Sequence, residues 1–216
     1  MENVKKRFDN RSVKEILLDY ALYIILFLIL AAVVIIRPDF LKVTNLINIV
    51  KQASTKGILA LGCAGLIVLA GTDLSIGRVL GLSAAVTASL VQSTTYASRM
   101  YPQITEPVAL WIPLVLSIAI GMLFGAINGF GVSKLHLHAF IITLGTSLIA
   151  YGANCLYIES QPSGTAQALS TFERDFLNLA AGNIIIGSLR IPKVVIYFLI
   201  CAVIMHIVWT RTRLGK

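Results

Sequence analysis

The stretch GTDLSIGRVLG, residues 71–81, lies between two long apolar runs of the chain. It places an acid, a hydroxyl and a base within six positions, as Asp73, Ser75 and Arg78. The first N–H groups of a helix have no partner inside that helix, so a side-chain oxygen of Thr72, Asp73 or Ser75 can cap a helix that begins here. We therefore interpret the stretch as a junction between two helices.

Composition places the whole chain in a membrane. Of its 216 residues, 57% are hydrophobic and only 13% are charged, whereas a soluble domain carries about 25% charged residues. The mean hydropathy is +0.84, and the chain has too little polar surface to cover itself in water. The formal charge of +8 is typical of the basic flanks of membrane spans that face anionic lipid, which we prefer to a nucleic-acid surface.

Charged residues divide the chain into six uncharged windows. They are residues 20–36, 57–72, 79–98, 107–133, 135–158 and 194–210. A spanning helix needs about 20 mostly apolar residues, so we expect an all-α, polytopic membrane protein with about six transmembrane helices. The second window extends backward to Thr44, which can cap its start. The third span is expected to begin near Ser75 and to end near Val91.

Lysine and arginine set the expected orientation. Both ends of the chain are basic, which predicts that the N- and C-termini are cytoplasmic. Residues 1–15 then form a cytoplasmic N-terminal segment, and residues 16–216 form one transmembrane domain. The junction and the KLHLH stretch at 134–138 face the cytoplasm, while the longer segments 92–106 and 159–193 face outward. In the last of these, residues 176–189 are uncharged but too short to cross, which predicts an interfacial or re-entrant helix.

Small residues recur at helical spacing in the third and fourth windows. They are Gly77 and Gly81 in the third window, and Gly121, Gly125 and Gly129 in the fourth. Close backbone approach drives the association of helices in lipid, and small residues permit it. We assign these glycines, together with Asp73 and Ser75, to the helix junction and to helix packing.

Four polar side chains lie at membrane depth within the apolar windows: Asn128, Thr143, Thr146 and Asn154. Polar groups there must find partners or line water. Hydrogen bonding between helices and a substrate path would both explain them, and we take all four as candidate substrate-path residues. The sequence has no Walker A, HExxH, GxSxG or CxxC motif. We therefore expect no catalytic residue, no metal site and no enzyme activity in this chain.

Several stretches together resemble one transporter family. They are LALGCAGLIVLA followed by GTDLSIGRVLGLSAA, then GAINGFGVSKLHLHAFIITLGTSLIAYG, STFERDF and WTRTRLGK. This combination resembles the permease subunits of bacterial ABC monosaccharide importers, the ribose, galactose and xylose class. Within that family the likeness is greatest to permeases of galactose/methyl-galactoside importers, and it extends from about residue 15 to residue 216. The family usually has proline where Ala139 stands.

The resemblance implies a permease subunit that forms the translocation path for galactose, methyl-galactoside or a related monosaccharide. It implies a multi-pass protein of the bacterial inner membrane, with no cofactor of its own and no nucleic-acid partner. The expected partners are a cytoplasmic ABC ATPase that binds ATP–Mg, a periplasmic sugar-binding protein and a second permease copy. Family members continue past the position of Lys216 through a loop that docks on the ATPase, so we expect the N-terminal part of a permease. An ion-coupled secondary sugar carrier and a truncated, non-transporting membrane fragment are the alternatives.

Overall fold

Each of the six apolar windows is helical over most of its length in the computed structural model, which describes residues 18–68, 71–162, 167–187 and 189–212. The chain divides into two units, Met1–Gln52 and Ala53–Lys216, and each is considered by itself. The predicted cytoplasmic segment, residues 1–15, lies outside the described residues.

The first unit contains an apolar helix and a turn that leads into a long second helix. Its elements are α3 (Ala21–Ile36), the 3-10 helix η1 (Pro38–Leu41) and the start of α4 (Val43–Val68). No residue of α3 is buried, and its apolar side chains therefore suit a lipid surrounding. Helix α4 begins at Val43, one residue before Thr44, so the prediction that Thr44 caps this helix is wrong.

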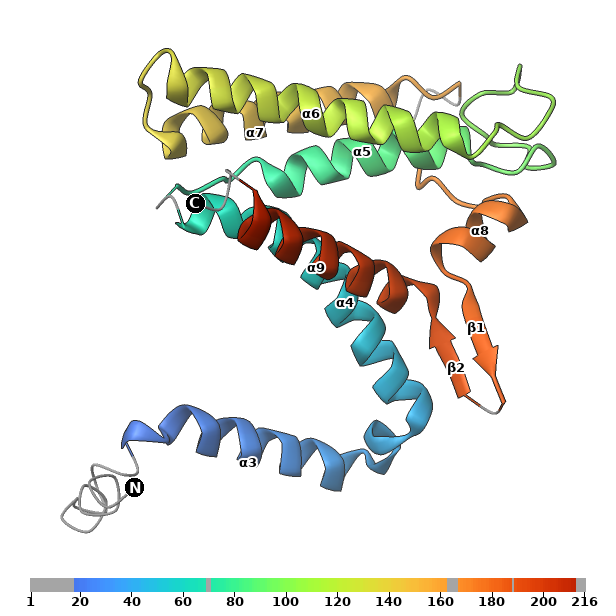
Figure 1. Ribbon diagram of the computed structural model, residues 1–216. Helices are drawn as coiled ribbons and strands as arrows, with labels where there is room; N and C mark the ends of the chain where they lie inside the picture. Colours follow the sequence, from blue (N-terminus) through green and yellow to red (C-terminus); the bar gives the residue numbers. More distant parts are fainter. Residues whose placement is uncertain (1–17, 69–70, 163–166, 188, 213–216) are drawn as a thin grey trace, which may run out of the picture. The chain divides into compact units, whose positions relative to one another are not determined.

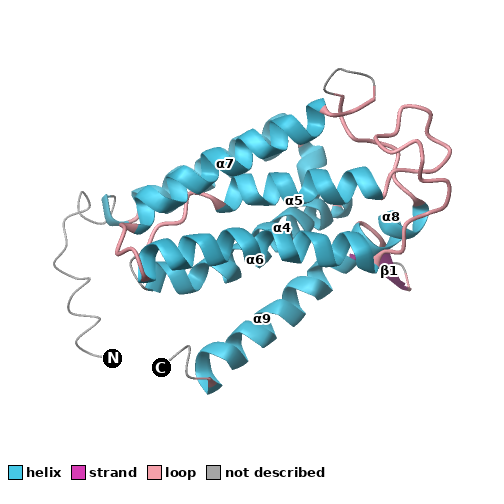
Figure 2. Cartoon of the chain, turned by 90° about the horizontal axis from the view of Figure 1, so that it is seen from above, coloured by secondary structure: helices cyan, strands magenta, loops and turns pink. Residues whose placement is uncertain are grey.

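Three helices of the second unit form a bundle. They are α5 (Ile76–Leu90), α6 (Trp111–Ser133) and α7 (Ala139–Glu159), which run side by side in Figures 1 and 2. Leu82, Phe124 and Ala150, one from each helix, form the buried centre of the bundle. Only residues 134–138 join α6 to α7, and so short a connection makes the two helices antiparallel. The start of α5 lies at the same end of the bundle as the start of α7, because the Leu74 N–H just before α5 bonds to Thr143 near the start of α7.

Helix α4 packs against the last helix, α9 (Lys193–Arg211), beside which it lies in Figure 1. A Cβ atom at Gly57 would come within 2.5 Å of the Phe198 ring, and one at Gly65 within 2.9 Å of the Trp209 ring. Both distances are shorter than any ordinary carbon contact, so the aromatic rings occupy the space that these glycines leave. The helical spacing of small residues in the sequence did not single out either glycine.

A short helix and a β-hairpin precede α9. They are α8 (Arg174–Ala180), β1 (Asn183–Ile186) and β2 (Leu189–Pro192), with β1 and β2 antiparallel. The prediction of a helix over residues 176–189 is therefore wrong in its second half. The run of three isoleucines in β1 has high β propensity. Gly187 follows at φ +64°, the left-handed conformation that two-residue hairpin turns require.

Within the described residues, three helices are long and apolar enough to cross a membrane: α6, α7 and α9. Helices α3 and α5 are apolar but shorter, at 16 and 15 residues, or about 24 and 22 Å at 1.5 Å per residue. Helix α4 has 26 residues but includes Lys51 and Lys56. The helical class agrees with the prediction, while the count of six spans and the cytoplasmic termini stay predictions.

Candidate functional site

The junction between α4 and α5 is held by an aspartate. Gly71 N–H donates to the carbonyl of Leu66 at 2.8 Å, which ties the junction to the last turns of α4. Oδ1 of Asp73 accepts from the backbone N–H of Ser75 at 2.7 Å and from its hydroxyl at 2.6 Å. Ser75 is the N-cap of α5, but its side chain bonds to no N–H of the helix. Of the three predicted capping side chains, Asp73 therefore orders the helix start.

A continuous chain of hydrogen bonds runs from this aspartate across the bundle. Nδ2 of Asn128 on α6 donates to the Ser75 hydroxyl oxygen at 2.9 Å, and the Thr146 hydroxyl on α7 donates to Oδ1 of Asn128 at 2.7 Å. Ser75 and Thr146 are each 2% exposed, and Asn128 is 8% exposed. We call Asp73, Ser75, Asn128 and Thr146 the junction network. It connects all three helices of the bundle.

The direction of each bond in the junction network follows from the carboxylate. An ionised carboxylate can only accept hydrogen bonds, so the single hydroxyl proton of Ser75 points to Asp73. The Ser75 oxygen is then left as an acceptor, and Asn128 must turn its amide N–H toward it. The amide oxygen of Asn128 consequently faces Thr146. The carboxylate of Asp73 thus fixes, through the Ser75 hydroxyl, the orientation of the buried Asn128 amide.

Thr143 makes a second connection between the junction and α7. Its hydroxyl oxygen accepts from the backbone N–H of Leu74 at 3.2 Å and lies 3.2 Å from the carbonyl oxygen of Thr72. The hydroxyl also reaches the carbonyl of Ala139 at 2.8 Å, within its own helix. The Thr143 side chain thereby satisfies the Leu74 N–H of the non-helical junction, while its single hydroxyl proton serves either the Thr72 or the Ala139 carbonyl.

These contacts show that α5 begins inside the bundle. Its junction touches Thr143 directly and reaches Thr146 through Asn128, four and seven residues after Ala139, the first residue of α7. At 1.5 Å per residue, this is about 6 to 10 Å inward from the start of α7. Non-helical backbone at membrane depth is tolerated where it is buried in protein or lines a water-filled cavity.

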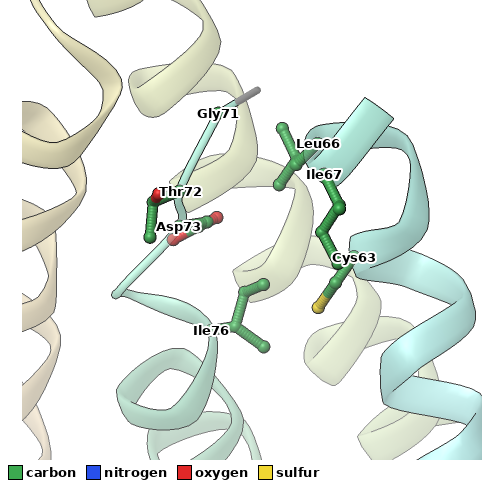
Figure 3. Close-up of a pocket in the computed structure, with 7 residues that line it drawn as sticks. All are labelled: Cys63, Leu66, Ile67, Gly71, Thr72, Asp73 and Ile76. Carbon is green, nitrogen blue, oxygen red and sulfur yellow. The ribbon is translucent and has the colours of Figure 1, made fainter. Parts of the chain in front are cut away.

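Three cavities surround the junction. One of about 370 Å³ lies between α4 and the junction, and Figure 3 shows its seven lining residues, with Asp73 projecting into the gap between the junction and α4. A second of about 380 Å³ is lined mainly by α5 and α6. A third of about 430 Å³ lies where the junction meets the last turns of α6 and the first turns of α7. Asp73 lines all three cavities.

Three of the four candidate path residues therefore meet in one place. Asn128 lines two of the cavities, Thr143 lines the largest, and Thr146 bonds to Asn128 behind them. Asn154 lies two turns farther along α7 and lines none of these cavities. Its Oδ1 is buried without a hydrogen-bond partner among the described residues. The role of these residues in a path stays a prediction.

The predicted glycine rows do not make close contacts inside this chain. A Cβ atom at Gly77, Gly81, Gly121, Gly125 or Gly129 would meet nothing within 4 Å. Three of them instead line the cavities around the junction, Gly121 and Gly125 in one and Gly125 and Gly129 in another. That these glycines allow close helix packing stays a prediction, and the helix they would contact lies outside the described residues. The close contact between α6 and α7 is made by Gly131, where a Cβ atom would come within 2.7 Å of Ile142.

The opposite end of the bundle carries a hydroxyl cluster that the sequence reasoning missed. The Tyr157 hydroxyl lies 2.6 Å from that of Ser89 and 2.9 Å from that of Tyr101. It links α7, α5 and the segment that follows α5. Polar residues inside two apolar windows were a usable signal here. Helices α5 and α7 are thus held together by polar contacts near both of their ends.

The two predicted outer segments also contact one another at this end. Gln92 and Phe172 form an antiparallel bridge, and the Ser93 N–H donates to the Thr171 carbonyl at 2.7 Å. A carboxylate oxygen of Glu173 accepts from the Thr94 N–H at 2.9 Å. Residues that were expected on one side of a membrane therefore lie together, 78 or more positions apart in sequence.

The described residues include no group of three or more histidine, cysteine, aspartate or glutamate side chains able to hold a metal ion. His138 instead serves as the N-cap of α7, where its Nδ1 accepts from the Phe140 N–H at 3.3 Å. Arg78 stacks over the Tyr151 ring, with its guanidinium carbon 4.4 Å from the ring centre, so its charge lies against α7.

Comparison with known proteins identifies the family. Residues 45–216 match the family described as the branched-chain amino acid transport system permease component. The chain is 40% identical over 209 residues to the galactose/methyl galactoside import permease protein MglC of Escherichia coli strain K12, covering 96% of this chain and 61% of that protein. The MglC protein of Haemophilus influenzae is 34% identical over 202 residues, which cover 94% of this chain and 59% of that protein.

The ribose import permease protein RbsC of Haemophilus influenzae is 36% identical over 162 residues, covering 75% of this chain and 46% of that protein. No solved structure matches the chain. The chain spans about three fifths of the length of the MglC relatives. From the family match and the helices described above, this chain is a membrane protein and belongs to the family of transport-system permease components.

Proposed function

We propose that this chain is part of the transmembrane permease subunit of an ATP-driven ABC importer for galactose, methyl-galactoside or a related monosaccharide. The observation that carries the proposal is the similarity to named galactose/methyl galactoside import permeases along nearly the whole chain, 40% identity over 96% of its residues. Two further relatives are named as ribose and D-allose permeases. A monosaccharide is therefore the substrate class that we infer.

The site around the junction suits a path for a polar solute. A buried network of hydroxyl, amide and carboxylate groups borders cavities of about 370 to 430 Å³, within the usual size range of ligand sites. We propose that Asn128 and Thr143 contact the sugar in transit, with Thr146 positioning Asn128. Asn154 would extend this path along α7.

We propose six spans with both termini in the cytoplasm and the protein in the bacterial inner membrane. Two contacts support the relative placement of the loops. The junction meets the start of α7 through Leu74 and Thr143, and residues 92 and 172 pair at the other end of the bundle. Each pair joins segments that the positive-inside rule assigns to one side.

The energy for transport would come from outside this chain. We propose that two cytoplasmic ABC ATPase subunits bind ATP–Mg, that a periplasmic protein delivers the sugar, and that two permease copies assemble around the path. The chain itself supplies a helical bundle and a polar site within it. It would bind no cofactor.

Reconstitution tests this proposal. The permease is placed in liposomes with its partner ATPase and sugar-binding protein, and uptake of labelled galactose, methyl-galactoside and ribose is measured together with ATP hydrolysis. We expect uptake that requires ATP and ATP hydrolysis that the loaded binding protein stimulates. Uptake driven by a proton or sodium gradient without the ATPase would instead establish a secondary carrier. Failure of the permease to assemble with the ATPase would also refute the proposal.

A further inference from the structure

Only one oxygen of the Asp73 carboxylate is used by the fold. Both of its hydrogen bonds, from the N–H and the hydroxyl of Ser75, go to Oδ1. No described residue donates to Oδ2, and no described lysine or arginine lies within ion-pair distance of the carboxylate. An ionised carboxylate has about four acceptor positions. Asp73 therefore keeps acceptor capacity at the edge of all three cavities.

A hydrogen-bond donor lies beside this acceptor. Asn128 gives one N–H of its side-chain amide to the Ser75 oxygen at 2.9 Å, and its second N–H has no partner among the described residues. The Ser75 oxygen is also 2.6 Å from Oδ1 of Asp73, so the carboxylate and the amide flank the same hydroxyl. Asp73 and Asn128 together line the cavities of about 380 and 430 Å³.

The remaining lining restricts the charge of a ligand. The three cavities are bordered mainly by apolar side chains such as Leu66, Phe124 and Val132, and their lining includes no lysine or arginine. A carboxylate without a neighbouring cation repels an anionic ligand, because like charges in a poorly hydrated site interact strongly. Neutral hydroxyl groups, which both donate and accept, match an adjacent carboxylate oxygen and amide N–H.

We propose that Asp73 and Asn128 form a subsite for a neutral, hydroxyl-rich ligand at the end of the bundle where α5 and α7 begin. Oδ2 of Asp73 accepts from one ligand hydroxyl and the free N–H of Asn128 donates to another. The inference rests on the proposed function, which supplies a sugar as the ligand and places this end toward the cytoplasm. It adds that Asp73 contacts the sugar directly, in addition to holding the start of α5.

The experiment measures inhibition by sugar on the cytoplasmic side. Liposomes containing the complete transporter are loaded with increasing galactose, and uptake of external labelled galactose is followed. Because the periplasmic binding protein remains outside, its selectivity does not affect the internal sugar. In the wild type we expect internal galactose to inhibit uptake, whereas galacturonate, its carboxylate analogue, should not inhibit at equal osmolarity.

Asp73→Asn is the matched variant. Asparagine keeps the oxygen that orders Ser75 and caps helices as well as aspartate does, so assembly should be retained while the charged acceptor is lost. We expect inhibition by internal galactose to weaken about tenfold, the effect of losing one charge-assisted hydrogen bond. Asp39→Asn removes an exposed aspartate that pairs with Lys42 and should leave the inhibition unchanged.

Two results would overturn the subsite. One is unchanged inhibition in Asp73→Asn, and the other is equal inhibition of the wild type by galactose and galacturonate. The galacturonate comparison needs no variant, so it decides the matter even where Asp73→Asn does not assemble. If the wild-type transporter takes up no sugar at all, the proposed function fails instead, and the two failures are thus distinguished.

Discussion

Replacing Asn128 by aspartate tests the direction of the junction network. The two side chains have nearly the same shape, but an ionised aspartate cannot donate a hydrogen bond. The Ser75 hydroxyl already gives its only proton to Asp73, so the Ser75 oxygen would face a second acceptor. Asn128→Asp should therefore destabilise the bundle more than Asn128→Ala, although alanine is the larger change in shape.

The expected magnitudes follow from the contacts. Asn128→Ala removes two hydrogen bonds between helices, which average about 0.6 kcal/mol each in membranes. The loss is limited because the Thr146 hydroxyl can turn to the carbonyls of Ile142 or Thr143, 3.1 and 3.2 Å away. The expected cost is therefore about 1 kcal/mol. Asn128→Asp leaves an uncompensated charge at a site that is 8% exposed, a change that costs about 3–5 kcal/mol when it is not relieved by protonation.

Thermal unfolding of the purified permease in detergent measures both variants. The order of stability should be wild type, then Asn128→Ala, then Asn128→Asp. Asn178→Asp adds the same charge at an exposed position and should unfold like the wild type. An Asn128→Asp variant as stable as the wild type would refute the assigned bond directions. Equal losses in the alanine and aspartate variants would show that packing alone, and not the donor, matters at this position.

Two further substitutions test the packing of the bundle and of its end opposite the junction. Gly131→Ala should lower stability by about 1–3 kcal/mol, because its Cβ would lie 2.7 Å from Ile142, and trimming Ile142 to alanine should recover part of the loss. Gly125→Ala, whose Cβ meets nothing within 4 Å, is the matched control. Equal melting temperatures for the two glycine variants would contradict the close contact. Glu173→Ala should speed hydrogen exchange of the Thr94 amide about fivefold, because the amide loses its acceptor. Glu173→Gln keeps an oxygen there, so its Thr94 amide should exchange like that of the wild type. Wild-type exchange in the alanine variant would mean that this bond does not hold segments 92–106 and 159–193 together.

The fold was largely predictable where burial in lipid decides it. Most of each uncharged window is helical, because a backbone in hydrocarbon must satisfy its polar groups internally. The third helix begins and ends within one residue of the predicted limits. The prediction of a helix over residues 176–189 failed from residue 183, where the first strand of a hairpin begins. Near the membrane surface, hydrophobicity does not distinguish a helix from a strand. There the β-branched run and the positive φ of Gly187 favour the hairpin.

The candidate site was predictable in its residues but not in its connections. Asn128, Thr143 and Thr146 stand out as polar groups in apolar windows, yet Asp73 is 55 positions from Asn128, and only the fold brings them to the same serine. Sequence spacing therefore identified members of the network and could not identify which group donates to which.

The glycines of α6 show why spacing alone misassigns a role. Gly121, Gly125 and Gly129 recur every four residues, a pattern that predicts close helix packing. Gly131, two positions beyond the row, is about 200° around the helix from Gly129, and it is Gly131 that contacts α7. The row consequently makes no close contact with α7 and instead borders the cavities beside Asp73 and Asn128. Side chains absent from that face leave the space in which the proposed ligand would lie, so the same small residues that suggest packing also keep the site accessible.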